Sequence, residues 1–142
     1  MFLSHFVKTL DAKGRLSLPA PFRAALAKEE GVFIHPALDQ PALDCGGEAL
    51  MATIRALLAS LPPYSPERED LALALLGTGE RVKLDPEGRL TLSERLKAEI
   101  GLTREAVIVG QGEKFQIWAA EAFAERLAAA RARAREIRRR TA

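Results

Sequence analysis

The sequence predicts an α+β fold made of two pseudo-symmetric repeats of the βαβ type. Residues 10–18 read LDAKGRLSL and residues 84–92 read LDPEGRLTL, so six of nine positions are identical within a chain of 142 residues. The similarity extends to PAPFRAAL at 19–26 and SERLKAEI at 93–100. One half offers too few strands and too little core to fold alone. The two halves are therefore expected to interlock their strands in one small barrel flanked by helices.

Each copy of the motif begins with residues typical of a type I turn. Asp-Ala-Lys-Gly at 11–14 and Asp-Pro-Glu-Gly at 85–88 have aspartate first and glycine fourth, which predicts a β-hairpin at each copy. After each turn polar and apolar residues alternate, as expected for a strand with one face against a core. The alternation directs Arg15 and Arg89 to solvent and the neighbouring leucines to the core.

The segment after each turn motif predicts a short helix. Pro19 or Pro21 in the first copy and Ser93 in the second are favourable starts. Gly31 and Gly101 are favourable ends. These helices are expected to be only a few turns long.

Strands are expected after each short helix. Residues 106–118, AVIVGQGEKFQIW, predict a hairpin with glycines in its turn. The counterpart at 31–45 contains Pro36 and Pro41, so it is expected to be less regular.

Longer helices complete the predicted fold. Residues 48–61 place their apolar side chains on one stripe, a second helix is expected at about 66–76 after Ser65, and the last at about 120–138. The chain is thus predicted to have three segments: a first repeat with its C-terminal helix, a helical linker, and a second repeat with a basic C-terminal helix, at residues 1–61, 62–80 and 81–142.

The positive charge of the chain is concentrated near its C-terminal end. The net charge is +2, but residues 131–140, RARAREIRRR, contain six arginines and one glutamate and so carry +5, which leaves −3 for the rest. Such a tail is typical of a protein that binds a polyanion. A helix with solvated arginines has the same composition, so the tail alone leaves both interpretations open.

The cysteine and histidine content argues against an enzyme. His5 and His35 are isolated, Cys45 has no partner at metal-ligand spacing, and no glycine-rich phosphate loop is present. A catalytic pair of Cys45 and His35 is the alternative to a buried, inert cysteine. We expect no catalytic residue, no metal and no cofactor. One cysteine excludes an internal disulfide, and the lack of a long apolar run predicts a cytoplasmic protein without a membrane segment.

The paired turns are the remaining candidates for a binding site. Asp11 and Asp85 are expected to cap their own turns through hydrogen bonds from the backbone. Each arginine could also form a local ion pair, but an exposed ion pair adds little stability and does not explain the same residue in both copies. An outward arginine fork suits phosphate or the edge of guanine. Lys13 and Arg23 make the first turn more basic, whereas Glu87 weakens the second.

Four stretches together resemble one protein family. The opening MF, the stretch TLDAKGRLSLPAPFR, the second LDPEGRLTL and the later FQIW are similar to the MraZ family, bacterial transcriptional regulators of the division and cell-wall gene cluster. Its relatives include AbrB-like swapped-hairpin DNA-binding proteins. The resemblance implies a double-psi-like, swapped-hairpin barrel of two AbrB-like repeats. It also implies a homo-oligomeric ring, octamer or dodecamer, that binds short promoter repeats in double-stranded DNA, including its own promoter, at the nucleoid.

The resemblance also implies which residues face DNA. They are the residues that match the family's turn motifs: Asp11, Lys13, Gly14, Arg15, Asp85, Gly88 and Arg89. Arg23 joins these DNA-binding candidates because of its positive charge near the first copy, not through the resemblance. Two positions depart from the family pattern. Ser4 stands where glycine is usual, and Ser93 replaces a common proline, so the second turn is expected to be set slightly differently.

Two alternatives to a sequence-specific regulator stay open. The first is an antitoxin of the swapped-hairpin class, which would need a disordered toxin-binding tail, whereas residues 119–142 predict a helix. The second is a structural ring or scaffold in which the arginines serve subunit contacts. Binding to promoter DNA separates these from a regulator, since a scaffold should retain DNA only weakly and without regard to sequence.

Overall fold

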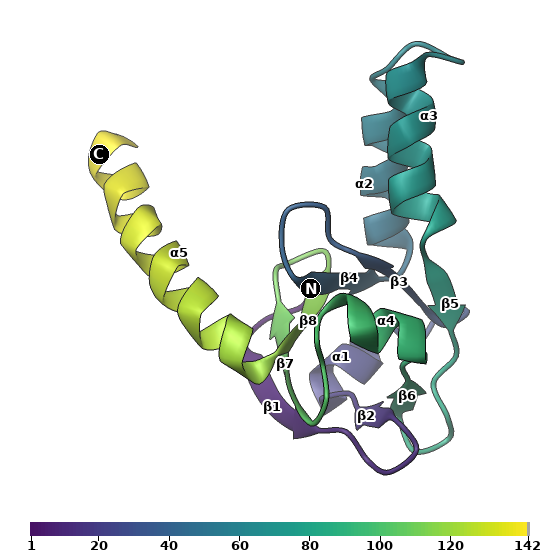
Figure 1. Ribbon diagram of the computed structural model, residues 1–142, viewed down its shortest axis with the longest axis vertical. Helices are drawn as coiled ribbons and strands as arrows, with labels where there is room; N and C mark the ends of the chain where they lie inside the picture. Colours follow the sequence, from purple (N-terminus) through teal and green to yellow (C-terminus); the bar gives the residue numbers. More distant parts are fainter. Residues whose placement is uncertain (142) are drawn as a thin grey trace.

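A computed structural model describes residues 1–141 and has an α+β fold, which confirms the predicted class (Figure 1). Both halves have the same order of elements, strand, strand, helix, strand, strand. In the first half these are β1 (His5–Thr9), β2 (Arg15–Ser17), α1 (Ala20–Ala25), β3 (Val32–Pro36) and β4 (Ala42–Gly46). In the second half they are β5 (Glu80–Val82), β6 (Arg89–Thr91), α4 (Glu94–Glu99), β7 (Glu105–Gly110) and β8 (Phe115–Ala119). The remaining helical elements are α2 (Glu48–Ala59), α3 (Pro66–Ala72), the π-helical turn η1 (Leu73–Gly77) and α5 (Ala120–Thr141).

The two halves exchange strands within one antiparallel sheet. The strand order is β1-β7-β8-β4-β3-β5, so β1 pairs with β7 of the second half and β5 pairs with β3 of the first. β2 and β6 form a separate two-stranded ribbon, with Leu16 opposite Leu90 at its centre. The halves are interlocked as predicted, but the predicted closed barrel is not found. Because β2 and β6 pair only with each other, the edge strands β1 and β5 remain unjoined within residues 1–141.

The predicted hairpins at the two turns are also wrong. The turns themselves form, because the N–H of Gly14 donates to the carbonyl of Asp11 and the N–H of Asp11 donates to the carbonyl of Arg15, both at 3.0 Å. The strands on either side then diverge to partners in the other half. The Asp11 carboxylate also accepts the N–H of Arg15 at 2.9 Å, a bond that stays within the turn.

The main core lies between one face of the sheet and the β2–β6 ribbon with its two short helices. Leu16 and Leu90 are completely buried, and Phe22 of α1 and Leu96 of α4 are buried beside them. Their cluster includes the apolar side chains of the sheet, Val32, Ile34, Leu43, Cys45, Ala106, Ile108, Phe115 and Ile117. Each fully buried leucine or phenylalanine contributes about 1.5–3 kcal/mol. The core thus fixes the ribbon against the sheet.

The starts of both short helices are confirmed. α1 begins directly after Pro19, and α4 begins after Ser93, whose hydroxyl accepts the N–H of Leu96 at 3.2 Å. α4 ends close to Gly101, but α1 ends well before Gly31. The longer helices lie where they were predicted, as α2, as α3 continued by η1, and as α5.

The expected irregularity of residues 31–45 is not found. β3 and β4 pair in regular antiparallel register, with Ile34 opposite Cys45 and His35 opposite Asp44. Pro36 is the last residue of β3 and Pro41 precedes β4. At these positions a missing backbone N–H removes no bond from the middle of the sheet.

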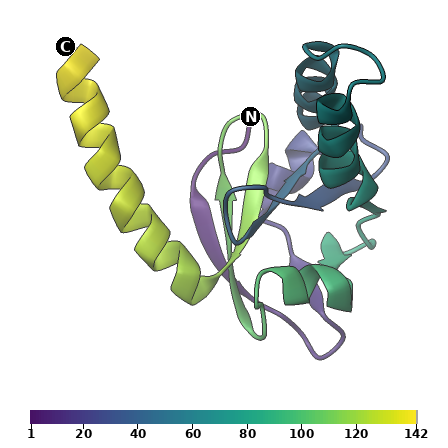
Figure 2. The ribbon, with the colours of Figure 1, turned by 45° about the horizontal axis from the view of Figure 1, so that its top comes forward.

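Two helical arms leave the opposite face of the sheet in different directions (Figures 1 and 2). α2, α3 and η1 form one arm, which packs on Phe33. α5 is the other arm, and its Phe123 packs on Val107 and Trp118. The distal half of α5 is exposed and leads away from the β2–β6 ribbon. The basic segment at 131–140 and the two turns are therefore far apart within one chain.

Candidate functional site

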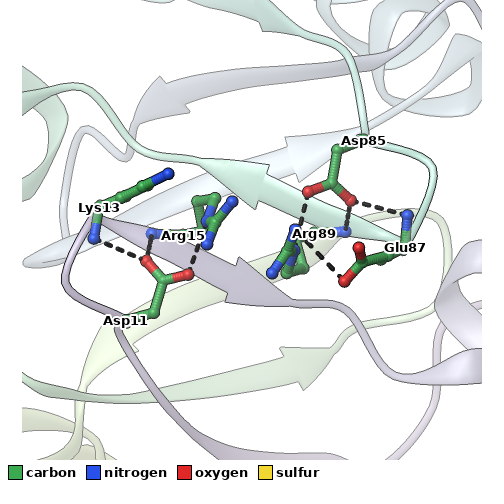
Figure 3. Close-up of polar contacts among 6 residues, drawn as sticks. All are labelled: Asp11, Lys13, Arg15, Asp85, Glu87 and Arg89. Carbon is green, nitrogen blue, oxygen red and sulfur yellow. Dashed lines mark hydrogen bonds and ion pairs between the residues drawn. The ribbon is translucent and has the colours of Figure 1, made fainter.

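The two arginine turns meet on one surface, the outer face of the β2–β6 ribbon. In the antiparallel register Arg15 lies opposite Thr91, and Ser17 lies opposite Arg89. Side chains alternate between the two faces of a strand, so these four residues share the face opposite the buried leucines. Arg15 and Arg89 are diagonal neighbours across the ribbon (Figure 3).

The first turn holds its arginine through one carboxylate. Oδ1 of Asp11 accepts the backbone N–H groups of Lys13 and Arg15, both at 2.9 Å. Oδ2 accepts Nε–H of Arg15 at 2.6 Å. Among residues 1–141, the terminal amino groups of Arg15 make no hydrogen bond. Gly14 closes the turn with φ +75°, a conformation that favours glycine. The result is an arginine fixed at Nε with its terminal N–H groups available.

The second turn repeats this arrangement and adds one contact. Oδ1 of Asp85 accepts the backbone N–H groups of Glu87 and Arg89 at 2.9 Å, and Oδ2 accepts Nε–H of Arg89 at 2.8 Å. In addition, Oε2 of Glu87 lies 3.3 Å from Nη2 of Arg89 (Figure 3). The predicted aspartate caps are confirmed in both turns, and each arginine does form a local ion pair.

The pKa values of both turn aspartates are lowered. The backbone N–H of Arg15 and then its guanidinium hold the pKa of Asp11 below its ordinary value, and Arg89 does the same for Asp85. In return the Asp85 carboxylate raises the pKa of Arg89. A carboxyl group with a lowered folded-state pKa stabilises the fold above its unfolded pKa, and this stabilisation is lost as the pH falls through the folded-state pKa.

A pH series should reveal this stabilisation. We compare the parent with the double variant Asp11→Asn, Asp85→Asn by urea unfolding. The parent should have the higher free energy of unfolding between about pH 5 and pH 8, and the difference should shrink below about pH 4 as the carboxylates are protonated. A difference that stays constant from neutral pH into acid would contradict a role for the two charges.

Cations from the short helices cover the glycine of each turn. Arg23 of α1 packs against Gly88 of the other half and donates Nη1–H to the carbonyl of Leu18 at 2.7 Å. Lys97 of α4 occupies the equivalent place, with Nζ 3.1 Å from the point where a Cβ on Gly14 would lie. Its ammonium group also donates to Oε1 of the exposed Glu94 at 2.7 Å. Sequence reasoning found Arg23 but assigned its charge to the first turn, whereas it lies over the glycine of the second turn; it missed Lys97. The repeat offset of 74 residues that relates the two turns also relates these two residues.

Every predicted site residue lies on or beside the ribbon. The cationic side chains gathered there come from both turns and both short helices: Lys13, Arg15, Arg23, Arg89 and Lys97. Asp11 and Asp85 orient the arginines, and Gly14 and Gly88 shape the turns with φ of +75° and +78°. The surface can present several N–H donors to an acceptor-rich, anionic partner.

The alternative of a catalytic pair of Cys45 and His35 is excluded, and Cys45 is the buried cysteine that was expected. The Cys45 side chain is fully buried in the main core, and burial raises the pKa of its thiol. His35 is on the other face of the sheet, where Nδ1 donates to the carbonyl of Pro36 at 2.9 Å. Within residues 1–141 no cluster of histidine, cysteine and carboxylate side chains could hold a metal ion. None of the helices described there is long and apolar enough to cross a membrane.

Comparison with known proteins identifies the family. The family model described as "MraZ protein, putative antitoxin-like" matches residues 1–37 and 75–142, which include both turns and the whole ribbon. The chain belongs to the MraZ family. The resemblance predicted from the sequence is thereby confirmed.

Similar MraZ proteins support this assignment over almost the full chain. A protein of Methylocella silvestris is 51% identical over 97% of this chain and 85% of its own length. One of Xanthobacter autotrophicus is 51% identical and one of Caulobacter vibrioides 40% identical, each over 96% of this chain and 88% of its own length. All three are named transcriptional regulator MraZ. These names describe regulators, which confirms that the chain is not an enzyme.

The two departures from the MraZ pattern have clear structural consequences. Ser4 has φ +70°, in the left-handed region that favours the glycine usual at this position. Ser93, at the position where the resemblance implied proline, caps α4 through its hydroxyl. The expected difference in the second turn is not found, because Asp85 makes the same hydrogen bonds as Asp11.

Proposed function

We propose that the chain is a sequence-specific DNA-binding regulator of transcription and that the β2–β6 ribbon contacts the double helix. One observation carries this proposal: two arginines, each fixed at Nε by an aspartate, share the outer face of one two-stranded ribbon. The major groove of B-DNA admits a two-stranded β-ribbon. Terminal N–H groups of a fixed guanidinium can donate in pairs to O6 and N7 of guanine.

The charges around the ribbon support two kinds of DNA contact. Arg15 and Arg89 are rigidly placed near the centre, which suits base recognition. Lys13 is exposed at the edge of the first turn, and Arg23 and Lys97 flank the glycines. Peripheral cations suit phosphate contacts, which position a protein on DNA without reading its sequence. The proposed interface includes Lys97 in addition to the residues predicted from the sequence.

Family membership supports a more detailed proposal. We propose that the binding sites are short promoter repeats upstream of a division and cell-wall gene cluster, including the chain's own gene, with the two repeats forming a swapped-hairpin unit. One chain offers one ribbon, so strong binding requires several chains acting together through effective concentration. A homo-oligomeric ring, octamer or dodecamer, at the nucleoid would supply them. Light scattering of the free protein measures the oligomer, and a monomer mass at micromolar concentration would contradict it.

Footprinting on the DNA upstream of the chain's own gene tests the proposed function. The protein should protect short repeated sites at moderate salt and should bind the protected fragment more tightly than a scrambled fragment of equal length. Specific complexes usually bind at least about a thousandfold more tightly than non-specific ones. Weak retention that is equal for both fragments would favour a structural ring instead. For the antitoxin alternative, α5 is helical over Ala120–Thr141, where a disordered tail was required.

The basic tail should contribute affinity without specificity. Residues 131–140 carry +5, are exposed and lie away from the ribbon. Removing residues 131–142 should therefore weaken binding to the protected and scrambled fragments equally and make the salt dependence shallower. Binding titrations at several salt concentrations measure both effects. Selective loss of binding to the protected fragment would contradict this role, and an unchanged salt slope would show that the tail does not contact phosphate.

A further inference from the structure

The two turns of the ribbon share one backbone structure but differ in charge. The repeat offset places Glu87 where the first turn has Lys13. In the first turn one aspartate faces one lysine and one arginine, for a net +1. In the second turn two carboxylates face one arginine, for a net −1. A helix cation also lies over each turn: Arg23 over Gly88 of the second, and Lys97, which pairs with Glu94 at 2.7 Å, over Gly14 of the first. With these groups included, the first turn carries +1 and the second carries 0. A ribbon with two nearly equivalent turns is therefore electrostatically unequal.

Glu87 acts directly on the arginine of its own turn. Its Oε2 lies 3.3 Å from Nη2 of Arg89, while Asp85 holds Nε of the same guanidinium at 2.8 Å. Arg15 has its aspartate at Nε and, within residues 1–141, no acceptor at its terminal amino groups. The side chain of Glu87 is 71% exposed, so no packing requires the carboxylate to lie there.

This ion pair places a carboxylate beside a terminal amino group of Arg89 that DNA would use. A bidentate contact to guanine needs two N–H groups on one edge of the guanidinium. At Arg89 one of these groups already faces a carboxylate, and a DNA backbone brought close would be repelled by Glu87. We propose that Glu87 withholds Arg89 from DNA, so that the ribbon binds through its first turn and in one direction along the duplex. This inference rests on the proposed function.

The pseudo-twofold arrangement of the ribbon explains why the charge difference sets the direction in which the ribbon docks along the duplex. Rotation by half a turn about the axis between Leu16 and Leu90 exchanges the two turns. Two equal turns would allow the ribbon to dock on one site in either direction. With Lys13 on one side and Glu87 on the other, only one direction places Arg15 and its neighbouring lysine at the preferred bases.

A double-mutant cycle tests the contact between Glu87 and Arg89. The probe is the promoter fragment protected in footprinting, with its scrambled counterpart, and binding is followed by fluorescence anisotropy. Glu87→Gln should bind the protected fragment about threefold to fivefold more tightly, the size expected when an exposed ion pair no longer competes. In an Arg89→Ala background the same change should have little effect. Glu67→Gln, at an exposed position on α3, is the control for loss of one negative charge.

The cycle separates this inference from the proposed function. If Glu87→Gln strengthens binding equally with and without Arg89, Glu87 acts only through general repulsion and the inference is wrong. It is also wrong if Glu87→Gln leaves binding unchanged while Arg15→Ala weakens it, although DNA recognition by the ribbon would stand. If Arg15→Ala itself has no effect, the proposed function fails first.

Directed cleavage of the DNA tests the orientation. Cys45 is fully buried, so a cysteine introduced at the exposed Ala12 can carry an iron-EDTA group alone. On the protected fragment, the labelled parent should cleave on one side of each site. The labelled Glu87→Lys variant should cleave on both sides of each site. In the labelled double variant Lys13→Glu, Glu87→Lys, the cleavage should move from the original side to the opposite side. Cleavage on both sides by the labelled parent, or an unchanged pattern after the exchange, would overturn the proposal.

Discussion

Replacing Arg15 by alanine should weaken binding to the protected promoter fragment about tenfold or more while leaving the fold intact. A bidentate contact to guanine provides roughly 1–3 kcal/mol of discrimination, and Arg15 is the arginine whose terminal amino groups are available. Its ion pair with Asp11 is partly exposed and adds little to stability. Fluorescence anisotropy with the protected and scrambled fragments measures the loss, and thermal melting verifies the fold.

Two matched variants sharpen this test. Arg89→Ala should lose less binding than Arg15→Ala, because Glu87 already competes for the Arg89 guanidinium. Arg55→Ala removes an exposed arginine from α2, paired with Glu48 and remote from the ribbon, and should bind as the parent does. If Arg15→Ala binds as well as the parent, or loses binding only because it unfolds, the turns are structural and do not read DNA.

Replacing Leu90 by alanine should cause the largest loss of stability, about 2–5 kcal/mol in the free energy of unfolding. Leu90 is completely buried and lies opposite Leu16 at the centre of the ribbon, so its removal leaves a cavity beneath β2 and β6. Urea unfolding measures the change. Leu16→Ala should lose a similar amount because the repeat places it in the equivalent position.

Leu73→Ala is the control for this prediction. Leu73 is 69% exposed in η1, so its loss should change stability by no more than about 0.5 kcal/mol. A variant Leu90→Ala as stable as Leu73→Ala would contradict the packing of the ribbon on the sheet. If Leu90→Ala remains folded but loses DNA binding, the cause is a displaced ribbon and not a lost base contact, because Leu90 is buried.

Local features of the fold could be predicted because nearby residues determine them. Aspartate and glycine at fixed positions specify the turns, and Ser93 specifies the start of α4. Alternation of apolar residues identified β2 and β6 as strands. It does not identify the partner of a strand, so the hairpins and the closed barrel were predicted wrongly. The irregular structure expected at residues 31–45 was predicted wrongly for a related reason. A proline disrupts a strand only when it lies within it, and the sequence alone did not show that Pro36 and Pro41 lie at strand ends.

In the candidate site, too, the features set by nearby residues could be predicted from the sequence, and those set by distant contacts could not. The repeat was sufficient to predict Asp11, Arg15 and their counterparts, because the motif contains both members of each pair. That both arginines share one ribbon depends on β2 pairing with β6 across 74 residues. Lys97 was missed because it packs on a glycine of the other half. The contact of Glu87 with Arg89 was anticipated only as an unfavourable charge.

Methylation interference at guanine N7 most directly tests the claim that the ribbon reads bases through Arg15. The protected promoter fragment is methylated at guanine, and bound and free DNA are then separated and compared. With the parent protein, methylation of a guanine within each protected site should block binding, because N7 lies in the major groove and accepts from arginine. With Arg15→Ala, methylation of that guanine should no longer matter. An interference pattern that is the same for the parent and for Arg15→Ala would contradict the account.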